Sequence, residues 1–188
     1  HPAERVQAEL LAIIREHRHA NANRLKAIEL LARQKEADKL WLPLATKVEA
    51  GSTLAALVEY LGLGKDKETE QFIQGQLKSQ SPEVRVAAIR ALSSRGVKTA
   101  SRDVQACLDD PEASVRLAAV EAMVRLRVAG VEDKLKVMCT MDTMTIRAAS
   151  LEALNDLNHQ DALEVASANL PHLATQAAAM RYLSQHGG

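Results

Sequence analysis

An eight-residue arrangement of charged, small and apolar positions recurs along the chain and predicts a repeated helix. It begins with Arg in four of its six copies, continues through small and apolar residues and closes with a large apolar residue, most clearly in the segment Arg-Val-Ala-Ala-Ile-Arg-Ala-Leu. Its six copies start 30, 31, 31, 31 and 29 residues apart. The copies occupy residues 24–31, 54–61, 85–92, 116–123, 147–154 and 176–183. Six copies in register indicate a repeat protein.

Each copy fits one face of an α-helix. At about 100° per residue, the position before the Arg and the fourth, fifth and eighth positions share a broad face. In the third copy these positions hold Val84, Ala88, Ile89 and Leu92. The alanine allows a neighbouring helix to come close, while the isoleucine and leucine supply apolar area for burial. We therefore expect this face to form the core.

The starts of two of these helices carry recognisable signals. Pro82 and Pro111 stand just before two copies, where the missing N–H of proline costs nothing. Ser81 and Asp110 precede them, and both residue types are favoured N-caps. We expect Ser81 and Asp110 to cap these helices.

A second helical segment lies between successive copies and carries an apolar rung of its own. Leu77, Leu108, Cys139 and Leu170 follow one another at intervals of 31 residues. The segments span residues 3–17, 36–48, 67–78, 101–108, 132–139 and 161–170. A helix–turn–helix unit of about thirty residues cannot bury its apolar face alone, so neighbours must stack. The sequence predicts an all-α fold, an α-solenoid of about six repeats that forms one domain over residues 1–188.

The repeat resembles HEAT repeats, specifically the short variety of about thirty residues found in phycobilisome-lyase-type HEAT proteins. The likeness lies in the second helix of each unit, in segments such as 81–92 and 109–116. The resemblance implies a right-handed superhelix whose second helices line the concave side. It also implies a bond between Asp110 and Arg116 that fixes the turn.

That bond is expected in one unit only. Ser79 and Met141 stand at the equivalent places before Arg85 and Arg147, and neither side chain can act as the acid of such a pair. HEAT arrays mostly serve as docking surfaces, so the resemblance specifies the fold more closely than the function.

Charge and composition exclude several classes of function. The 24 Lys and Arg are balanced by 24 Asp and Glu, and aromatic residues make up 2% of the chain, which argues against a nucleic-acid partner. No stretch is long and apolar enough to span a membrane. Two cysteines are too few for a disulfide scaffold, and the compartment stays open. Because the chain opens with His1 and ends in Gly188, we expect it to be a piece of a longer protein.

No residue pattern points to catalysis, a cofactor or a metal, so we expect a protein that is not an enzyme. His17 and His19 point about 200° apart on a helix, so only an unwound helix end would let both bind one metal ion, and a solvated helix end is the favoured interpretation. No His is followed by Glu or Asp, unlike the ligand pairs of iron-dependent hydroxylases that resemble this fold. Residues 62–67 lack the features of a phosphate-binding loop and predict an inter-repeat turn.

The two cysteines have separate predictions. Cys139 occupies the apolar rung, which predicts a small buried hydrophobe. Cys107 sits one position earlier, so we expect partial exposure. A disulfide between them is not favoured.

The few aromatic residues favour structural roles, with one exception. Trp41 and Phe72 lie in first helices, where a core or inter-repeat contact is expected. Tyr60 and Tyr182 share the seventh repeat position, and the polar end of a tyrosine there needs a partner or water. We expect Tyr60 to contribute to a binding surface.

The sixth repeat position lies nearly opposite the buried face and predicts a row of exposed charges. It reads Glu29, Glu59, Arg90, Glu121, Glu152 and Arg181. One interpretation of the row is a solvated face with charges of alternating sign. On the concave side implied by the resemblance, it would instead form a mixed-charge, net acidic groove for a protein or peptide with basic and apolar residues. The leading hypothesis is therefore a non-enzymatic interaction scaffold for a protein partner or for another domain of its parent chain.

The two ends of the array should be less well covered than its interior. Neither end shows an obvious polar cap, and the Ala-rich unit at residues 161–186 should expose apolar surface.

An alternative function is an accessory subunit of an enzyme, as in the phycobilin lyases that the short repeat resembles. DNA binding of the HEAT-like glycosylase type is opposed by the glutamates of the row and by the few aromatic residues.

Overall fold

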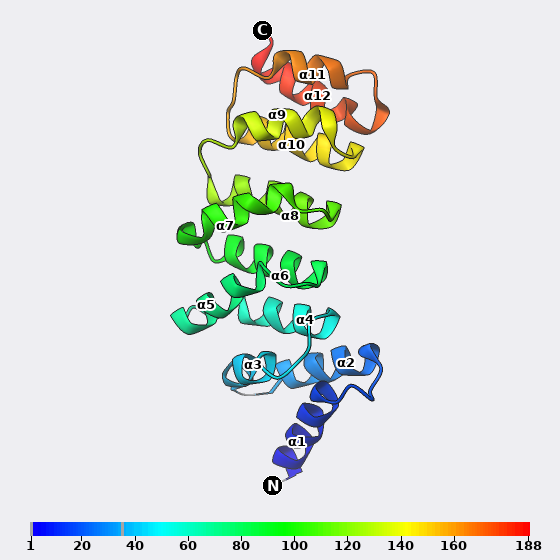
Figure 1. Ribbon diagram of the computed structural model, residues 1–188, viewed down its shortest axis with the longest axis vertical. Helices are drawn as coiled ribbons and strands as arrows, with labels where there is room; N and C mark the ends of the chain where they lie inside the picture. Colours follow the sequence, from blue (N-terminus) through cyan, green and yellow to red (C-terminus); the bar gives the residue numbers. More distant parts are fainter. Residues whose placement is uncertain (1, 35) are drawn as a thin grey trace. The chain divides into compact units, whose positions relative to one another are not determined.

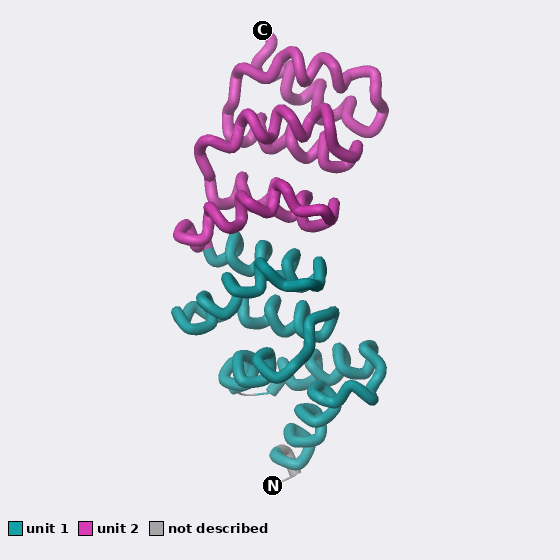
Figure 2. Tube along the Cα trace, viewed as in Figure 1, with its two compact units in different colours: residues 1–95 teal, residues 96–188 magenta. Residues whose placement is uncertain are grey.

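The computed structural model describes residues 2–34 and 36–188, and all regular secondary structure in them is helical. The chain divides into two compact units, residues 1–95 and 96–188 (Figure 2). The predicted all-α fold of stacked helix pairs is therefore confirmed. The single domain over residues 1–188 and the handedness of the superhelix stay predictions.

The first unit contains six helices, which alternate between the predicted first and second members of a pair (Figure 1). Three of them, α2, α4 and α6, contain the first three copies of the eight-residue pattern. The helices are α1 (Pro2–Arg15), α2 (Asn21–Ala32), α3 (Asp38–Ala45), α4 (Ser52–Leu61), α5 (Lys67–Gln76) and α6 (Pro82–Ser94).

The second unit repeats this order, with the remaining copies in α8, α10 and α12. Two short 3₁₀ segments, η1 (Lys98–Ala100) and η2 (Cys107–Asp109), flank its first helix. The helices are α7 (Ser101–Ala106), α8 (Ala113–Leu126), α9 (Glu132–Met141), α10 (Met144–Asp156), α11 (Leu163–Asn169) and α12 (Leu173–His186). The predicted helix pairs are thus present in both units, with boundaries that differ by a few residues.

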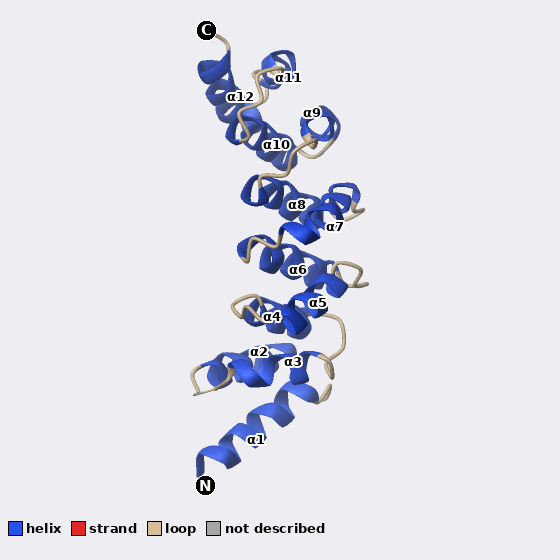
Figure 3. Ribbon diagram, turned by 90° about the vertical axis from the view of Figure 1, so that its left-hand side faces the viewer, coloured by secondary structure: helices blue, strands red, loops and turns tan. Residues whose placement is uncertain are grey.

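Within each unit the helices form two layers. In the first unit α4 packs against both α2 and α6, and in the second unit α10 packs against both α8 and α12. Figure 3 shows α8, α10 and α12 in one column and α7, α9 and α11 in the other. Each even-numbered helix also packs against the odd-numbered helix that precedes it. This stacking buries apolar faces between neighbouring pairs, as the period of the sequence requires.

The predicted core face is buried. Val84, Ala88, Ile89 and Leu92 of α6 are each 0% exposed. Burying a branched apolar side chain of this size contributes about 1.5–3 kcal/mol, so each repeat adds several such contributions to the core. None of the described helices is long and apolar enough to cross a lipid bilayer.

The two predicted helix caps are wrong in detail. Ser81 occupies the N-cap position of α6, but its hydroxyl donates to the carboxylate of Glu83 and accepts no backbone N–H of the helix. Asp110 lies outside α8, whose N-cap position is Glu112; the Asp110 carboxylate accepts the Glu112 N–H at 2.9 Å. Pro111 delays the start of the helix, so the aspartate stabilises the turn before it instead.

The arginine that opens the repeat ties together the two helices of a pair. Its guanidinium donates to a backbone carbonyl at or just beyond the end of the preceding first helix, at 2.8 Å in each of four repeats. The donor and acceptor residues are Arg24 and Ile14, Arg85 and Ser79, Arg116 and Asp110, and Arg147 and Cys139. Such hydrogen bonds satisfy backbone carbonyl groups at the helix end that have no intrahelical partner.

The family-derived expectation for this turn therefore needs correction. Arg116 donates to the backbone oxygen of Asp110, while the Asp110 carboxylate accepts the Glu112 N–H. Arg85 makes the same backbone bond to the carbonyl of Ser79, so this bond does not require an acid at that place.

Candidate functional site

The six residues at the sixth repeat position are all exposed. Glu29, Glu59 and Arg90 lie on α2, α4 and α6 of the first unit. The second unit carries the other three, Glu121 on α8, Glu152 on α10 and Arg181 on α12. The residue that precedes each of them is buried on every one of these helices except α12, so within each unit the charged side chains border a packed helix layer. We call these six residues the charged row.

In the second unit, the charged row borders a groove between α8 and α10. The groove has a volume of about 260 Å³, and Glu121 lines one side while Glu152 lines the other. Asp156 and Arg125 also line it, so three carboxylates face one guanidinium. Val120, Val124 and the alanines of α10 supply apolar area between them. The groove is therefore narrow, acidic and partly apolar.

One carboxylate of the groove already pairs with an arginine of the same unit. Arg181 donates to Glu152 Oε1 at 3.2 Å, and the two side chains are 60% and 47% exposed. An exposed pair of this kind contributes about 0–1 kcal/mol. A basic partner could therefore replace Arg181 at Glu152 at little cost.

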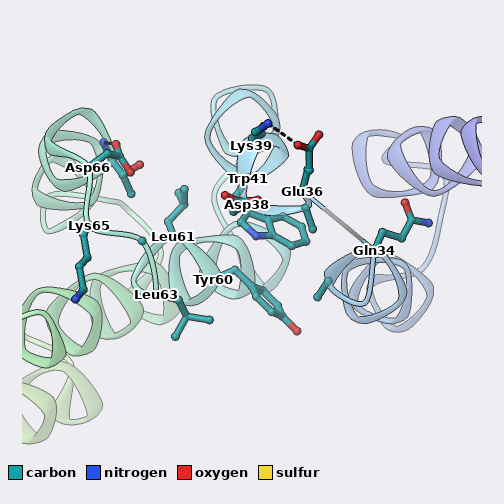
Figure 4. A pocket seen from close by; sticks show the side chains of 14 residues that line it. Gln34, Glu36, Asp38, Lys39, Trp41, Tyr60, Leu61, Leu63, Lys65 and Asp66 are labelled. Carbon is teal, nitrogen blue, oxygen red and sulfur yellow. Dashed lines mark hydrogen bonds and ion pairs between the residues drawn. The ribbon is translucent and has the colours of Figure 1, made fainter.

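The first unit holds a larger cleft beside the charged row. Its volume is about 700 Å³, and it lies between the α2–α3 connection and the α4–α5 connection. Figure 4 shows Trp41 of α3 and Tyr60 of α4 next to each other in this cleft. Leu63, from the turn after α4, is 79% exposed and adds an apolar side chain to the wall.

The two aromatic rings of the cleft are stacked. Their centroids are 4.9 Å apart with an interplanar angle of 26°. Trp41 is 5% exposed and supports Tyr60, which is half-buried and directly follows Glu59 of the charged row. A tyrosine ring that stacks on a buried tryptophan has little conformational freedom left to lose when a partner binds. Aromatic side chains held in this way contribute strongly to interfaces.

Charges of both signs surround the aromatic pair. Three carboxylates, from Glu36, Asp38 and Asp66, line the cleft together with the ammonium groups of Lys39 and Lys65. Lys39 donates to Glu36 at 2.7 Å. The hydroxyl and backbone N–H of Thr69 hold the pKa of Asp66 below its usual value, so this carboxylate remains charged at neutral pH.

Glu29 of the charged row forms an ion pair with a lysine on the same helix. Lys26 donates to Glu29 Oε2 at 2.7 Å and holds the pKa of that carboxyl below its usual value. The ion pair with Lys26 therefore favours the charged form of Glu29.

The cysteines do not form a reactive site. Both are free thiols and both are buried, so the expected partial exposure of Cys107 is wrong, whereas the burial of Cys139 is confirmed. Burial raises the pKa of the Cys139 thiol to about 12, although the nearby Arg147 opposes the shift. A thiol with that pKa is protonated at neutral pH and is a poor nucleophile.

The remaining sequence candidates lie apart from the cleft and the groove. His17 and His19 fall in the turn after α1, where His17 Nδ1 lies 3.3 Å from Glu49 and His19 Nε2 lies 3.5 Å from Glu16. In the part of the chain that the structure describes, no group of three or more His, Cys, Asp or Glu side chains is arranged to hold a metal ion. Residues 62–66 form the connection between α4 and α5, as predicted.

The aromatic predictions had mixed outcomes. Trp41 is buried as expected, while Phe72 is only half-buried. Tyr182, at the same repeat position as Tyr60, is 0% exposed; its hydroxyl accepts the N–H of Ala162 at 3.0 Å and donates to the carbonyl of His159. Tyr60 is therefore the tyrosine that remains available to a partner.

Sequence reasoning missed the cleft itself. It identified Tyr60 as a surface candidate and Trp41 as a core residue, but it gave no sign that the two would stack. The exposed Leu63 within a glycine-flanked turn was the one available signal, because a large apolar residue in a turn has no local reason to be there.

The comparison with known families agrees with this architecture. A family model described as HEAT repeats matches residues 39–124, which run from α3 into α8. Residues 39–124 are therefore similar to HEAT repeats, and the helices on either side of them carry the same repeat pattern. A comparison with curated proteins finds no significant match. The assignment to the short, phycobilisome-lyase type of repeat stays a prediction.

Proposed function

We propose that this chain is a non-enzymatic scaffold for protein interactions and that the charged row, with Tyr60, receives a protein or peptide partner. Proteins built from HEAT repeats commonly act as scaffolds for protein interactions. Within that general role, the partner segment carries basic and large apolar side chains.

The observation that carries the proposal is the acidic groove between α8 and α10. Glu121, Glu152 and Asp156 line it against the single Arg125, and valines and alanines form its floor. A Lys or Arg side chain satisfies the carboxylates, while an apolar neighbour covers the floor. Each exposed ion pair contributes about 0–1 kcal/mol, so several rungs must act together to give useful affinity.

The Trp41–Tyr60 cleft supports the same partner chemistry in the first unit. Aromatic side chains that pack against a buried residue are typical hot spots of protein interfaces. Glu59, adjacent to Tyr60, places a carboxylate beside the ring, so a cationic side chain could contact both the ring face and the charge. Basic and apolar residues in the partner thus suit both units.

Selection of peptides on the immobilised chain tests the proposal directly. A displayed library of random peptides should be enriched in sequences that combine Lys or Arg with large apolar residues. A selected peptide should bind the double variant Glu121→Lys/Glu152→Lys at least about tenfold more weakly, equivalent to about 1.4 kcal/mol. Raising the salt concentration should weaken the wild-type complex, because exposed charges are screened.

A matched control separates the groove from general charge effects. Glu164 on α11 is exposed and lies outside the groove, and Glu164→Lys changes the charge in the same direction. This variant should bind the selected peptide as the wild type does. Enrichment of acidic peptides, or equal binding by the double variant and the wild type, would show that the charged row is not the partner site.

A further inference from the structure

The cleft beside Tyr60 continues into a second hollow between α3 and α5. This hollow has a volume of about 430 Å³, and Leu42 and Pro43 of α3 form an apolar part of its wall. Four residues line both spaces, namely Asp38, Lys39, Asp66 and Thr69. The cleft and the hollow are therefore one continuous depression, which we call the α3–α5 groove. It lies wholly within the first unit.

One end of the α3–α5 groove is apolar. Tyr60 is half-buried on Trp41, and Leu63 is 79% exposed in the connection that follows α4. Figure 4 shows Tyr60, Leu61 and Leu63 together at this end. A large apolar side chain that entered here would contact both an aromatic ring and an exposed leucine, and burial of that surface favours binding.

The other end of the groove carries an excess of negative charge. Asp38, Asp66 and Glu68 line the second hollow, together with the single ammonium group of Lys39. Lys39 already donates to Glu36 at 2.7 Å. In the part of the chain that the structure describes, neither Asp38 nor Glu68 forms an ion pair. A cation from a partner would therefore meet carboxylates that the chain has not neutralised.

The second unit shows how the chain itself neutralises a carboxylate at the place of Glu68. Three intervals of 31 residues separate Glu68 from Asp161, and the same offset separates Pro43 from Lys136. Lys136 of α9 donates to Asp161, just before α11, at 2.6 Å, and its side chain is only 21% exposed. The first unit thus keeps an acid at this place but has an uncharged proline where the second unit has the lysine.

We propose that the α3–α5 groove holds a short segment of a protein partner, in which a large apolar side chain contacts Tyr60 and Leu63 and a nearby lysine or arginine contacts Asp38 and Glu68. The cation of the partner takes the place at Glu68 that Lys136 takes at Asp161. This inference rests on the proposed scaffold function, because it assumes a protein partner. It assigns that partner a contact on α3 and α5, which carry none of the charged row.

Both contacts are needed in one segment. A single exposed ion pair contributes little affinity, so the apolar contact must add to it. An acidic segment is disfavoured, because its carboxylates would lie among those of the groove.

The fluorescence of Trp41 reports on this groove, because Trp41 is the one tryptophan of the chain and stacks on Tyr60. The probes are blocked synthetic peptides without tryptophan or tyrosine, each with one Leu and one Lys separated by an increasing number of glycines. At least one spacing should change the fluorescence of Trp41 in a saturable way. The same peptide with Gln in place of Lys, or with Gly in place of Leu, should bind at least about fivefold more weakly.

A pair of variants at Pro43 tests the comparison between the units. Pro43→Lys places a lysine where the second unit has Lys136, so its ammonium group competes with the peptide for Glu68. Pro43→Gln removes the same ring without adding a charge. The Leu–Lys peptide should bind Pro43→Lys at least about fivefold more weakly than Pro43→Gln. Equal binding by these two variants would overturn the proposal, as would the absence of a saturable fluorescence change at every spacing.

A second pair of variants has a matched control. Glu68 and Glu164 are both exposed glutamates in the first turn of a first helix, α5 and α11 respectively. Glu68→Lys should weaken peptide binding at least about fivefold, whereas Glu164→Lys should bind the peptide as the wild type does. Circular dichroism should show the same helix content for both variants. Equal binding by Glu68→Lys and Glu164→Lys would contradict the assigned cation site.

Two measurements identify other occupants of the groove. If N-acetyl-leucine amide binds as tightly as the peptide, the groove takes a small apolar molecule and the proposal is wrong. Light scattering should show a monomer of 20.4 kDa. A dimer that Glu68→Lys dissociates would assign the groove to a second copy of the chain and likewise overturn the proposal.

The double variant Glu121→Lys/Glu152→Lys separates this inference from the proposed function. If the double variant loses the Trp41 response while Glu68→Lys retains it, the peptide binds the charged row and the groove assignment is wrong. If the peptides fail to change the fluorescence of Trp41, the groove assignment fails. The selection of peptides on the double variant would still decide the role of the charged row.

Discussion

The guanidinium of Arg116 in α8 holds the carboxylate of Asp142, just beyond α9, through two hydrogen bonds. Nε donates to Oδ2 at 2.8 Å and Nη2 donates to Oδ1 at 2.7 Å. The two side chains are 18% and 10% exposed. The same guanidinium also donates to the carbonyls of Asp110 and Pro111, so one residue links the first helix, the second helix and the following repeat.

Asp142→Asn should destabilise the protein, because the substitution removes the charge that Arg116 needs. The pKa of Asp142 lies below its usual value owing to these hydrogen bonds, which shows that the charged form is favoured in the folded state. We expect the free energy of unfolding to fall by about 1–3 kcal/mol, measured by urea denaturation at neutral pH. Asp133→Asn is the control, since the Asp133 side chain is fully exposed and should contribute less than about 0.5 kcal/mol.

Acid should weaken the first unit through Glu49. Arg24, whose side chain is 3% exposed, pairs with this carboxylate and lowers its pKa from 4.5 to about 2. Because the pKa is lower in the folded state, the stabilisation is complete above about pH 4.5 and is lost as the pH falls towards 2. Glu49→Gln should therefore lose less stability than the wild type across this range, as measured by denaturation at several pH values. Parallel curves for the two proteins would contradict the prediction.

Two tyrosines at one repeat position should respond differently to the same substitution. Tyr182→Phe removes a buried hydroxyl and leaves the N–H of Ala162 and the carbonyl of His159 without it, at a cost of about 1–3 kcal/mol in the free energy of unfolding. Tyr60→Phe changes a half-buried ring and should cost less than about 0.5 kcal/mol. Thermal or urea unfolding of both variants tests this, and equal costs would show that Tyr182 is not held as described.

The thiols should be protected until the protein unfolds. Cys107 and Cys139 are 7% and 0% exposed, and the pKa of Cys139 is raised to about 12 by burial. A thiol-specific chromogenic reagent at mildly alkaline pH should react slowly with the native protein. It should react with both thiols at once in denaturant. Fast reaction in the native state, or the recovery of fewer than two thiols after unfolding, would contradict the structure.

Two glycines, one directly after α4 and one inside α5, should give opposite results when replaced by alanine. A Cβ at Gly62 would lie 2.8 Å from the Cβ of Ala91 in α6, so Gly62→Ala should force the helices apart and cost about 1–3 kcal/mol. At Gly75, inside α5, a Cβ would have nothing within 4 Å, and Gly75→Ala should stabilise the protein by up to about 1 kcal/mol. Chemical denaturation of both variants gives the sign of each effect.

The helices, their pairing and their core faces were predictable from the order of the amino acids alone. An α-helix converts spacing along the chain directly into direction around an axis, so a recurring pattern fixes which side of each helix is apolar. That is why Ile89 and Leu92 were correctly expected in the core and Glu121 and Glu152 on the surface. The 31-residue interval then required the pairs to stack, because no single pair could bury that face.

Only the tertiary structure decided what surrounds each position. Tyr60 and Tyr182 occupy the same place in the repeat, yet one is half-buried on Trp41 and the other is enclosed by the connection before α11. Likewise, Met180 fits the core pattern but is 58% exposed. Burial and pairing depend on neighbours that are distant in sequence. The residue types also do not show which backbone carbonyl, such as that of Asp110, accepts a hydrogen bond from an arginine. The pattern therefore specifies the helix, while the neighbouring helices determine the environment of each of its residues.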